Sequence, residues 1–263
     1  MGTGYSTDGV LKDFWEYDPS ANQWMQKMDF KGEARSGAVG FSIEDRGYIG
    51  TGSGMNGVLK DFWEYDPSAN QWMQKMDFKG EARSDAVGFS IGGMGYIGTG
   101  YGMNGYLKDF WEYDPTSDLW TPRTDFGGGL RQSAVGFSIG DRGYIGTGYG
   151  MNGYLKDFWE YDPTTYQWTP WTDFGGGLRQ SAVGFSIGDR GYIGTGYDNA
   201  LILYNDFWEY DPNTHLWTQR EGYPGNARYS GVGFSIGNRG YMGTGGNYTG
   251  RKIEFWEYVP EDQ

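Results

Sequence analysis

Short segments of this chain alternate large apolar residues with small ones. In residues 38–43 (AVGFSI), the Val, Phe and Ile fall on one side of an extended strand, whereas the Ala, Gly and Ser fall on the other. A neighbouring sheet can pack closely against the small side of such a strand. Helical periodicity is absent, and Gly or Asp-Pro interrupts the chain roughly every ten residues, so the pattern predicts short antiparallel strands.

One unit recurs along the whole length. Phe-Trp-Glu-Tyr begins at positions 14, 62, 110, 158, 207 and 255, and Gly-Phe-Ser-Ile begins at positions 40, 88, 136, 184 and 233. Residues 10–36 are identical to 58–84, and 125–149 are identical to 173–197. A fixed period of about 50 residues predicts a solenoid or a propeller.

Each unit predicts four strands, a to d, here at 38–43, 47–52, 61–65 and around Trp72. Aromatic residues fall on both faces of every predicted sheet, so each sheet must lie between two others. Stacking the sheets around an axis buries these rings and leaves only short edges exposed. We therefore predict an all-β fold, a β-propeller of four-stranded antiparallel blades.

Three motifs of the repeat resemble those of a known family. Gly-Thr-Gly closes strand b, Asp-Phe-Trp-Glu-Tyr-Asp-Pro follows, and a Trp comes about nine residues later. In these motifs the whole chain resembles the bacterial-type kelch-repeat β-propeller family. It departs from that family where a Thr splits the usual double glycine, at Thr51, Thr99, Thr147, Thr195 and Thr244. The resemblance implies a propeller that commonly acts as a binding module.

The repeat predicts one domain over residues 1–263. Complete blades are expected at about 34–77, 82–125, 130–173 and 178–222, with a fifth, closing blade built from 228–258 plus 1–28. One of the two terminal c strands, at 14–17 or 255–258, is then surplus. Six blades, or a dimer that exchanges the surplus strand, are the alternatives to a five-bladed monomer.

Composition narrows the possible functions. Cys is absent and His215 is the single histidine, which excludes Cys-His nucleophiles and zinc sites of His and Cys. A net charge of −13 argues against nucleic acid and anionic membranes as partners. We expect no metal and no cofactor.

The chain shows no signal peptide and no apolar run long enough to span a membrane. These features predict a cytoplasmic protein for the sequence as given. Because the first residues fall inside a repeat, a secreted protein with a further upstream segment is the alternative.

Antiparallel strand order places the d–a and b–c loops on one face of a propeller. An arginine opens every strand a, at Arg35, Arg83, Arg131, Arg179 and Arg228. Five guanidinium groups around a channel mouth could hold a carboxylate, a sulfate or an acidic peptide. The alternative is a structural role, in which each arginine bonds to loop carbonyls or to acids such as Glu33 and Glu81.

The b–c loops carry Tyr101, Tyr149, Tyr197 and Tyr204, which are suited to contact with sugars or peptides. The loop at 197–206 is the longest and most apolar of them, and either offers a patch to a partner or covers the closure region. The segment 52–57 matches GxGxxG, but a strand rather than a helix follows, which argues against a phosphate site.

Six glutamates of the Phe-Trp-Glu-Tyr motifs occupy equivalent places, so they are expected to pair with Lys and Arg and not to form a catalytic pair. The sequence favours a non-catalytic module that binds a protein, peptide or glycan through the d–a and b–c face. A mainly architectural protein, recently amplified or engineered, is the alternative, since adjacent units are nearly identical. An enzyme is the least favoured hypothesis, because catalysis needs unique residues that break the symmetry.

Overall fold

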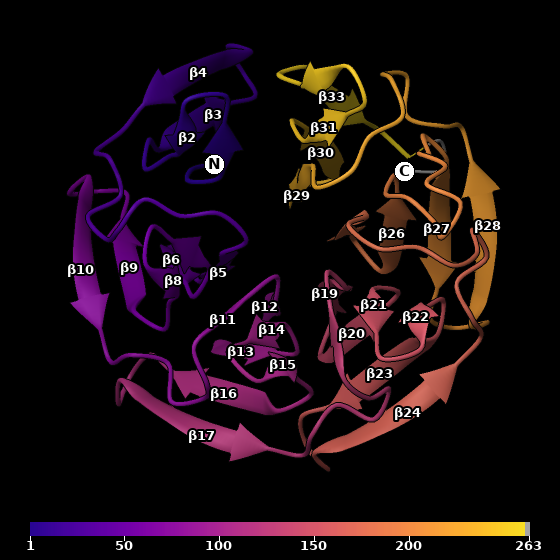
Figure 1. Cartoon of the computed structure of the whole chain (residues 1–263), viewed down its shortest axis with the longest axis horizontal. Helices are drawn as coiled ribbons and strands as arrows, with labels where there is room; N and C mark the ends of the chain where they lie inside the picture. The colour runs from indigo at the N-terminus through magenta and orange to yellow at the C-terminus, as the bar shows by residue number, and fades with distance from the viewer. Residues whose placement is uncertain (261–263) are drawn as a thin grey trace.

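Antiparallel strands form the regular structure of the computed structural model, which describes residues 1–260. None of these residues belongs to a helix long and apolar enough to span a membrane. The sheets stand side by side around a central axis, an arrangement consistent with a β-propeller (Figure 1).

Four sheets have four strands each, ordered along the chain from the axis outward. The first contains β5 (Val39–Ile43), β6 (Arg46–Gly50), β9 (Phe62–Asp66) and β10 (Gln71–Lys75). The second contains β12 (Val87–Ile91), β13 (Met94–Gly98), β16 (Phe110–Asp114) and β17 (Leu119–Arg123). The third contains β19 (Val135–Ile139), β20 (Arg142–Gly146), β23 (Phe158–Asp162) and β24 (Gln167–Trp171). The fourth contains β25 (Val183–Ile187), β26 (Arg190–Gly194), β27 (Phe207–Asp211) and β28 (Leu216–Arg220). These strands lie where the repeat predicts strands a to d.

The alternation of large and small residues explains how the sheets stack. A Cβ atom placed on Gly136 would lie 2.8 Å from Cβ of Val87, and one on Gly143 would lie 2.5 Å from the ring of Phe89. The large side of each inner strand therefore packs directly against glycines of the next sheet. Only glycine permits this close approach, as the sequence pattern predicts.

Aromatic rings form the outer part of every junction. Phe110 on β16 meets the edge of Tyr161 at 4.8 Å and of Trp168 at 5.0 Å in the next sheet. The same Phe–Tyr contact joins six successive sheets and returns to its start, through Phe14–Tyr65, Phe62–Tyr113, Phe110–Tyr161, Phe158–Tyr210, Phe207–Tyr258 and Phe255–Tyr17. These ring contacts link neighbouring sheets along the chain and also link the C-terminal sheet to the N-terminal one.

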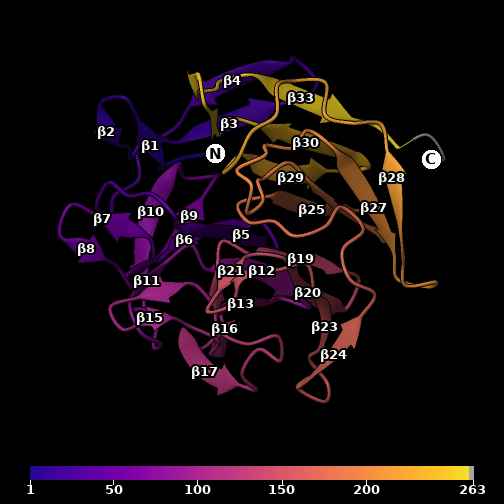
Figure 2. The same cartoon turned by 45° about the vertical axis from the view of Figure 1, so that its right-hand side comes forward.

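The two ends of the chain form separate sheets. One has β29 (Val232–Ile236), β30 (Arg239–Gly243) and β33 (Phe255–Tyr258), and the other has β3 (Trp15–Asp18) and β4 (Gln23–Gln26). Both views place β33 beside β3 and β4 (Figures 1 and 2). The structure therefore differs from the prediction of one closing blade made of 228–258 plus 1–28. The c strands at the two ends, β3 and β33, thus lie in separate sheets and do not pair with each other.

Small hairpins decorate the face that carries the d–a and b–c loops. They are β1 (Tyr5–Ser6) with β2 (Gly9–Val10), β7 (Ser53–Gly54) with β8 (Gly57–Val58), β14 (Tyr101–Gly102) with β15 (Gly105–Tyr106), β21 (Tyr149–Gly150) with β22 (Gly153–Tyr154), and β31 (Gly246–Asn247) with β32 (Gly250–Arg251). Two of them pair with d–a segments, β11 (Arg83–Ser84) and β18 (Arg131–Gln132). This pairing brings the d–a and b–c loops together on one face, as predicted. Hairpin strands also follow each GxGxxG match, in place of the helix that a phosphate site needs.

Candidate functional site

The five arginines that open the inner strands are fully buried. In Arg131 the guanidinium donates from Nη1 to the carbonyl of Thr147 at 2.8 Å and, through both Nη atoms, to Asp157 at 2.7 Å. Its charge also lies 4.7 Å from the centre of the Phe126 ring. Asp61, Asp109, Asp206 and Glu254 are the matching partners of Arg35, Arg83, Arg179 and Arg228.

This burial corrects the hypothesis of an arginine collar that captures an anion. The carboxylate of the motif's first Asp already holds each guanidinium, except in the last unit, where Glu254 replaces it. The pair is bidentate in the first four units and a single contact of 3.4 Å for Arg228, and in all five the arginine side chain is closed off from the solvent. Arg35, Arg83, Arg131, Arg179 and Arg228 therefore have the structural role, with partners other than the Glu33 and Glu81 carboxylates that the sequence suggested.

A ring of loop residues frames the inner end of this face. Gly37, Asp85, Ser133, Ser181 and Ser230, here called the mouth residues, each precede a residue that lines the central cavity. The backbone N–H of each of the last four donates to the carbonyl of the one before, for example Ser133 to Asp85 at 2.9 Å and Ser181 to Ser133 at 3.0 Å. All five have φ between 51° and 61°. Their side chains are therefore held in fixed positions around the mouth.

Asp85 breaks the symmetry of the mouth. Equivalent places hold Gly or Ser, whereas Asp85 brings a carboxylate that accepts a hydrogen bond from the Ser84 hydroxyl at 2.9 Å. The residue is exposed at its surface, but the surrounding loops displace much of the water around its carboxyl, and this desolvation raises the pKa of the Asp85 carboxyl. Asp85 is not among the candidates that the repeat pattern predicts, although position 85 is where the identical units 10–36 and 58–84 first diverge.

Tyrosines form a continuous row over the same face. The row runs through Tyr101, Tyr106, Tyr149, Tyr154, Tyr197 and Tyr229, with successive ring centres 5.3, 5.9, 5.0, 5.8 and 5.5 Å apart and all pairs edge to face. We call these six residues the tyrosine row. Three of them were predicted candidates, Tyr101, Tyr149 and Tyr197, and the structure brings them together.

The row follows the mouth because of strand register. Tyr101 pairs with Ser84 and Tyr149 with Gln132, the residues that precede mouth residues Asp85 and Ser133. The Gln180 amide donates to the Tyr197 hydroxyl at 2.6 Å, which fixes that ring. The sequence held a signal for the missed partners Tyr106 and Tyr154, since they follow Tyr101 and Tyr149 across two-residue turns and must share a face.

The loop at 197–206 is anchored at one end and open at its tip. Tyr204 donates to Asp198 at 2.7 Å, which raises the pKa of the Tyr204 phenol, and its ring lies 4.3 Å from the Arg179 guanidinium. Tyr204, the fourth predicted tyrosine, is thus a support of the loop and stands outside the row. Leu201 and Ile202 are both more than half exposed, which favours a patch for a partner over a cover for the closure region.

Apolar side chains surround the tyrosine row on the hairpin tips. Met55, Met103 and Met151 are 86, 87 and 75% exposed, and Leu130 and Leu178 are exposed in the d–a loops. Exposed methionines adapt their shape readily to an apolar partner. The face as a whole therefore combines a polar, aromatic centre with a soft apolar rim.

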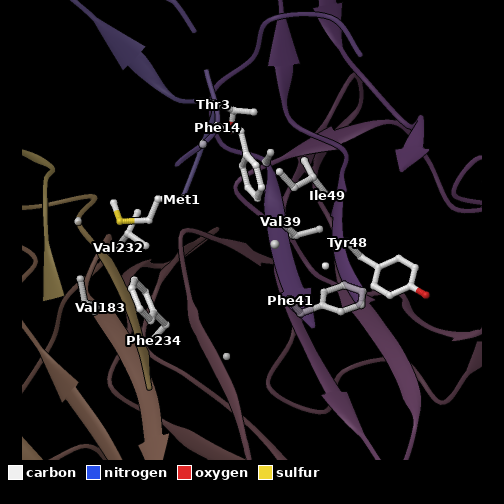
Figure 3. Close-up of a pocket in the computed structure, with 18 of the residues that line it drawn as sticks. Met1, Thr3, Phe14, Val39, Phe41, Tyr48, Ile49, Val183, Val232 and Phe234 are labelled. Carbon is white, nitrogen blue, oxygen red and sulfur yellow. The ribbon is translucent and has the colours of Figure 1, made fainter. Parts of the chain in front are cut away.

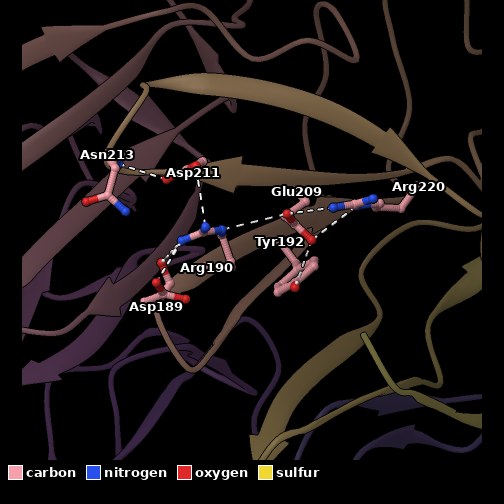
Figure 4. Close-up of polar contacts among 7 residues, drawn as sticks. All are labelled: Asp189, Arg190, Tyr192, Glu209, Asp211, Asn213 and Arg220. Atoms are coloured by element: carbon pink, nitrogen blue, oxygen red, sulfur yellow. Dashed lines mark hydrogen bonds and ion pairs between the residues drawn. The ribbon is translucent and has the colours of Figure 1, made fainter. Parts of the chain in front are cut away.

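The repeated glutamates lie in the sheets and are paired, as predicted. Glu209 accepts hydrogen bonds from the Tyr192 hydroxyl at 3.0 Å and from Arg220 Nη2 at 2.9 Å, while Arg190 bridges it to Asp211 (Figure 4). The other five form ion pairs, Glu16–Lys27, Glu64–Lys75, Glu112–Arg123, Glu160–Arg142 and Glu257–Arg239. Within residues 1–260 no cluster of three or more His, Cys, Asp or Glu side chains is arranged to hold a metal ion.

No family model matches the chain, and no curated protein matches it. The chain is similar to a solved structure described as "Structure of YjhT", with a TM-score of 0.82 and 16% sequence identity over 100% of this chain and 95% of that chain. At this identity the likeness shows the fold alone, an all-β chain of repeated antiparallel sheets.

Proposed function

We propose that this protein is a kelch-type propeller that acts as a non-catalytic binding module for a peptide segment of a partner protein. The observation that carries the proposal is the tyrosine row beside the channel mouth. Tyrosines offer large rigid contact area together with a hydroxyl, so a row of them suits an extended chain of mixed polarity. Asp85 at the mouth adds one fixed acceptor for a donor of the ligand.

The rim of the face favours a peptide over a glycan. Exposed Met103 and Met151 at the hairpin tips offer no hydrogen bonds to sugar hydroxyls, but they bury well against apolar side chains of a protein. The exposed Leu201 and Ile202 extend the same apolar surface. A peptide that crosses the row would therefore place polar groups over the tyrosines and apolar groups at the rim.

The proposal includes a ring of six blade positions in place of the predicted five. The closed cycle of six Phe–Tyr contacts and the separation of the terminal sheets support this count. The sheet at β29, β30 and β33 then lacks an outer strand, and the sheet at β3 and β4 lacks its inner strand.

A selection from a displayed random-peptide library tests the binding face. Immobilised wild-type protein should enrich peptides with a common motif, and a Tyr149→Ala/Tyr154→Ala variant should not retain them. Tyr166→Ala is the matched control, because Tyr166 is also exposed but lies in a c–d turn on the opposite face. If the Tyr149→Ala/Tyr154→Ala variant retained the enriched peptides while the Tyr166→Ala control lost them, the result would contradict the proposed binding face.

The architectural alternative rests on the near-identity of adjacent units. It predicts that no peptide motif is enriched by folded wild-type protein, and that the tyrosine variants differ from wild type in stability only.

A further inference from the structure

One junction of the ring is open. The large face of the last inner strand, β29, exposes Val232 by 42% and Ile236 by 37%, whereas the equivalent Val183 and Ile187 on β25 are 3% and 1% exposed. Nothing among residues 1–260 covers β29 in the way that β29 itself covers β25. The exposed pair faces the central cavity, which has a volume of about 590 Å³.

The opposite wall is open too. A Cβ atom on Gly88 or Gly95 of the second sheet would clash with Val39 or Phe41, at 2.9 and 2.6 Å. On the first sheet, a Cβ on Gly40 or Gly47 would meet no atom nearer than 3.7 Å. Figure 3 shows the strand of Val39 and Phe41 across the cavity from that of Val232 and Phe234.

The floor of this opening is a short strand edge. Gly2 bridges to Phe14 as Gly146 bridges to Phe158 in the third sheet. One edge of residues 1–3 is bonded to the β3 segment, with Trp15 donating to the Met1 carbonyl at 2.7 Å and Thr3 to the Asp13 carbonyl at 3.1 Å. Met1, Gly2 and Thr3 also line the cavity. The edge toward the cavity is therefore available to a further strand.

We propose that this opening, bounded by Val232, Ile236, Gly40, Gly47 and residues 1–3, is a binding slot for a β-hairpin of a partner polypeptide, in which large apolar residues alternate with Gly, Ala or Ser. The occupant's small residues would face Val232 and its large residues would face Gly40. The four junctions between successive inner strands, from β5 to β29, have this arrangement. The occupant of the slot would therefore repeat an interface that the chain already makes four times. The slot is distinct from the tyrosine row and goes beyond the proposed function.

The repeat itself supplies the probe. A synthetic peptide of residues 132–144 contains strand a, the turn and the start of strand b. It ends before Ile145 and Gly146, because Met1 and Gly2 occupy the equivalent places in the N-terminal sheet. Labelled with a fluorophore and titrated with the folded 263-residue protein, it should bind with saturation, and it should raise the melting temperature in a concentration-dependent way. A peptide of the same composition in scrambled order should do neither.

Gly40→Leu tests the place of binding. A Cβ atom at position 40 would meet no atom nearer than 3.7 Å, so we expect the variant to keep the wild-type melting temperature but lose saturable binding of the peptide. Met73→Leu, exposed on outer strand β10, should bind as wild type does.

Two outcomes would overturn the proposal. One is absent or scramble-insensitive binding, or binding that Gly40→Leu leaves unchanged. The other is a wild-type dimer in light scattering that Gly40→Leu converts to a monomer, since a second copy of the chain would then fill the slot.

Discussion

Arginine and tyrosine side chains of one face have opposite surroundings. Arg131 lies behind the loops with its guanidinium closed off by Asp157, whereas Tyr149, one hairpin away, keeps part of its ring at the surface. The difference follows from where each side chain starts: the arginine points into the junction between loop and sheet, and the tyrosine lies on the outer side of a hairpin. The buried arginines thereby support the fold, whereas the binding that we propose involves the tyrosines of the same loops.

The buried arginines make the first prediction. Arg131→Ala should lower the free energy of unfolding by about 3–5 kcal/mol, because it leaves a carboxylate and a carbonyl without their donor in a crowded site. Urea denaturation measures the change. Arg142→Ala, which removes a partly exposed arginine with several acidic neighbours, should cost less than about 1 kcal/mol. Equal losses in the two variants would speak against the structural role.

Asp85 makes a prediction about pH. Its pKa is raised on folding, so the folded protein holds this proton more tightly than the unfolded chain, and the free energy of unfolding falls as pH rises above the ordinary carboxyl range. Asp85→Ser, which restores the residue found at Ser133 and Ser181, should therefore stabilise the protein at pH 7. Thermal melts from pH 3 to pH 7 should show this gain disappear at the acidic end. A gain that is independent of pH would exclude desolvation of the carboxylate as its cause.

An inner strand that has a sheet on each side, such as β12, β19 or β25, works as a two-sided spacer. Its Val, Phe and Ile fill the space over the glycines of the next sheet, so the small residues are as necessary to the stack as the large ones. At the open junction a Cβ atom on the equivalent glycines, Gly40 or Gly47, would meet no atom nearer than 3.7 Å. Comparing the two kinds of junction therefore separates the effect of a glycine on packing from its effect on the backbone.

This contrast predicts that a Gly→Ala substitution destabilises the protein at an intact junction and has little effect at the open one. Gly191→Ala places a Cβ 2.5 Å from the Phe137 ring and should cost about 1–3 kcal/mol of unfolding free energy. Gly47→Ala, at the equivalent place on the open wall, should stay within about 0.5 kcal/mol of wild type. Chemical denaturation of both variants compares them. A similar loss in Gly47→Ala would mean that the slot is closed in solution.

The molecule as a whole depends on contact between its two ends. The Tyr17 ring centre lies 5.0 Å from that of Phe255 and 5.3 Å from that of Tyr241, whereas the matching pairs at Phe110–Tyr161 and Tyr96–Tyr161 are 4.8 and 5.7 Å apart. Among residues 1–260 no strand pairing joins the terminal sheets, and the contacts between them are made by side chains. A closed cycle also leaves fewer exposed sheet edges, which limits association through them.

A double-mutant cycle tests this closure. Tyr17→Ala and Phe255→Ala should be coupled by about 0.5–1.5 kcal/mol, as expected for an edge-to-face pair. The pair Tyr113 and Phe62, with 4.8 Å between ring centres inside the chain, provides the reference coupling. Strictly additive losses for the terminal pair would show that the ring opens in solution.

The sequence by itself determined the strands and how they stack. The alternation in AVGFSI, the turns at Asp-Pro and the period of 48 residues are local signals, and local signals place strands and repeat them. The pairing of the glutamates could also be predicted, because equivalent positions in a repeat have equivalent partners. The tyrosines were recognised as surface candidates because hairpin loops carry their side chains outward.

Only the tertiary structure decided the partners of residues far apart in the chain. Arg131 finds Asp157 from 26 positions away, and Tyr106 finds Tyr149 in the next unit. Whether the aromatic residues at 14–17 and 255–258 would lie in one sheet or in two was likewise a question of packing in three dimensions. Period and pattern describe one unit at a time, whereas the ring and its open slot arise only when all the units meet.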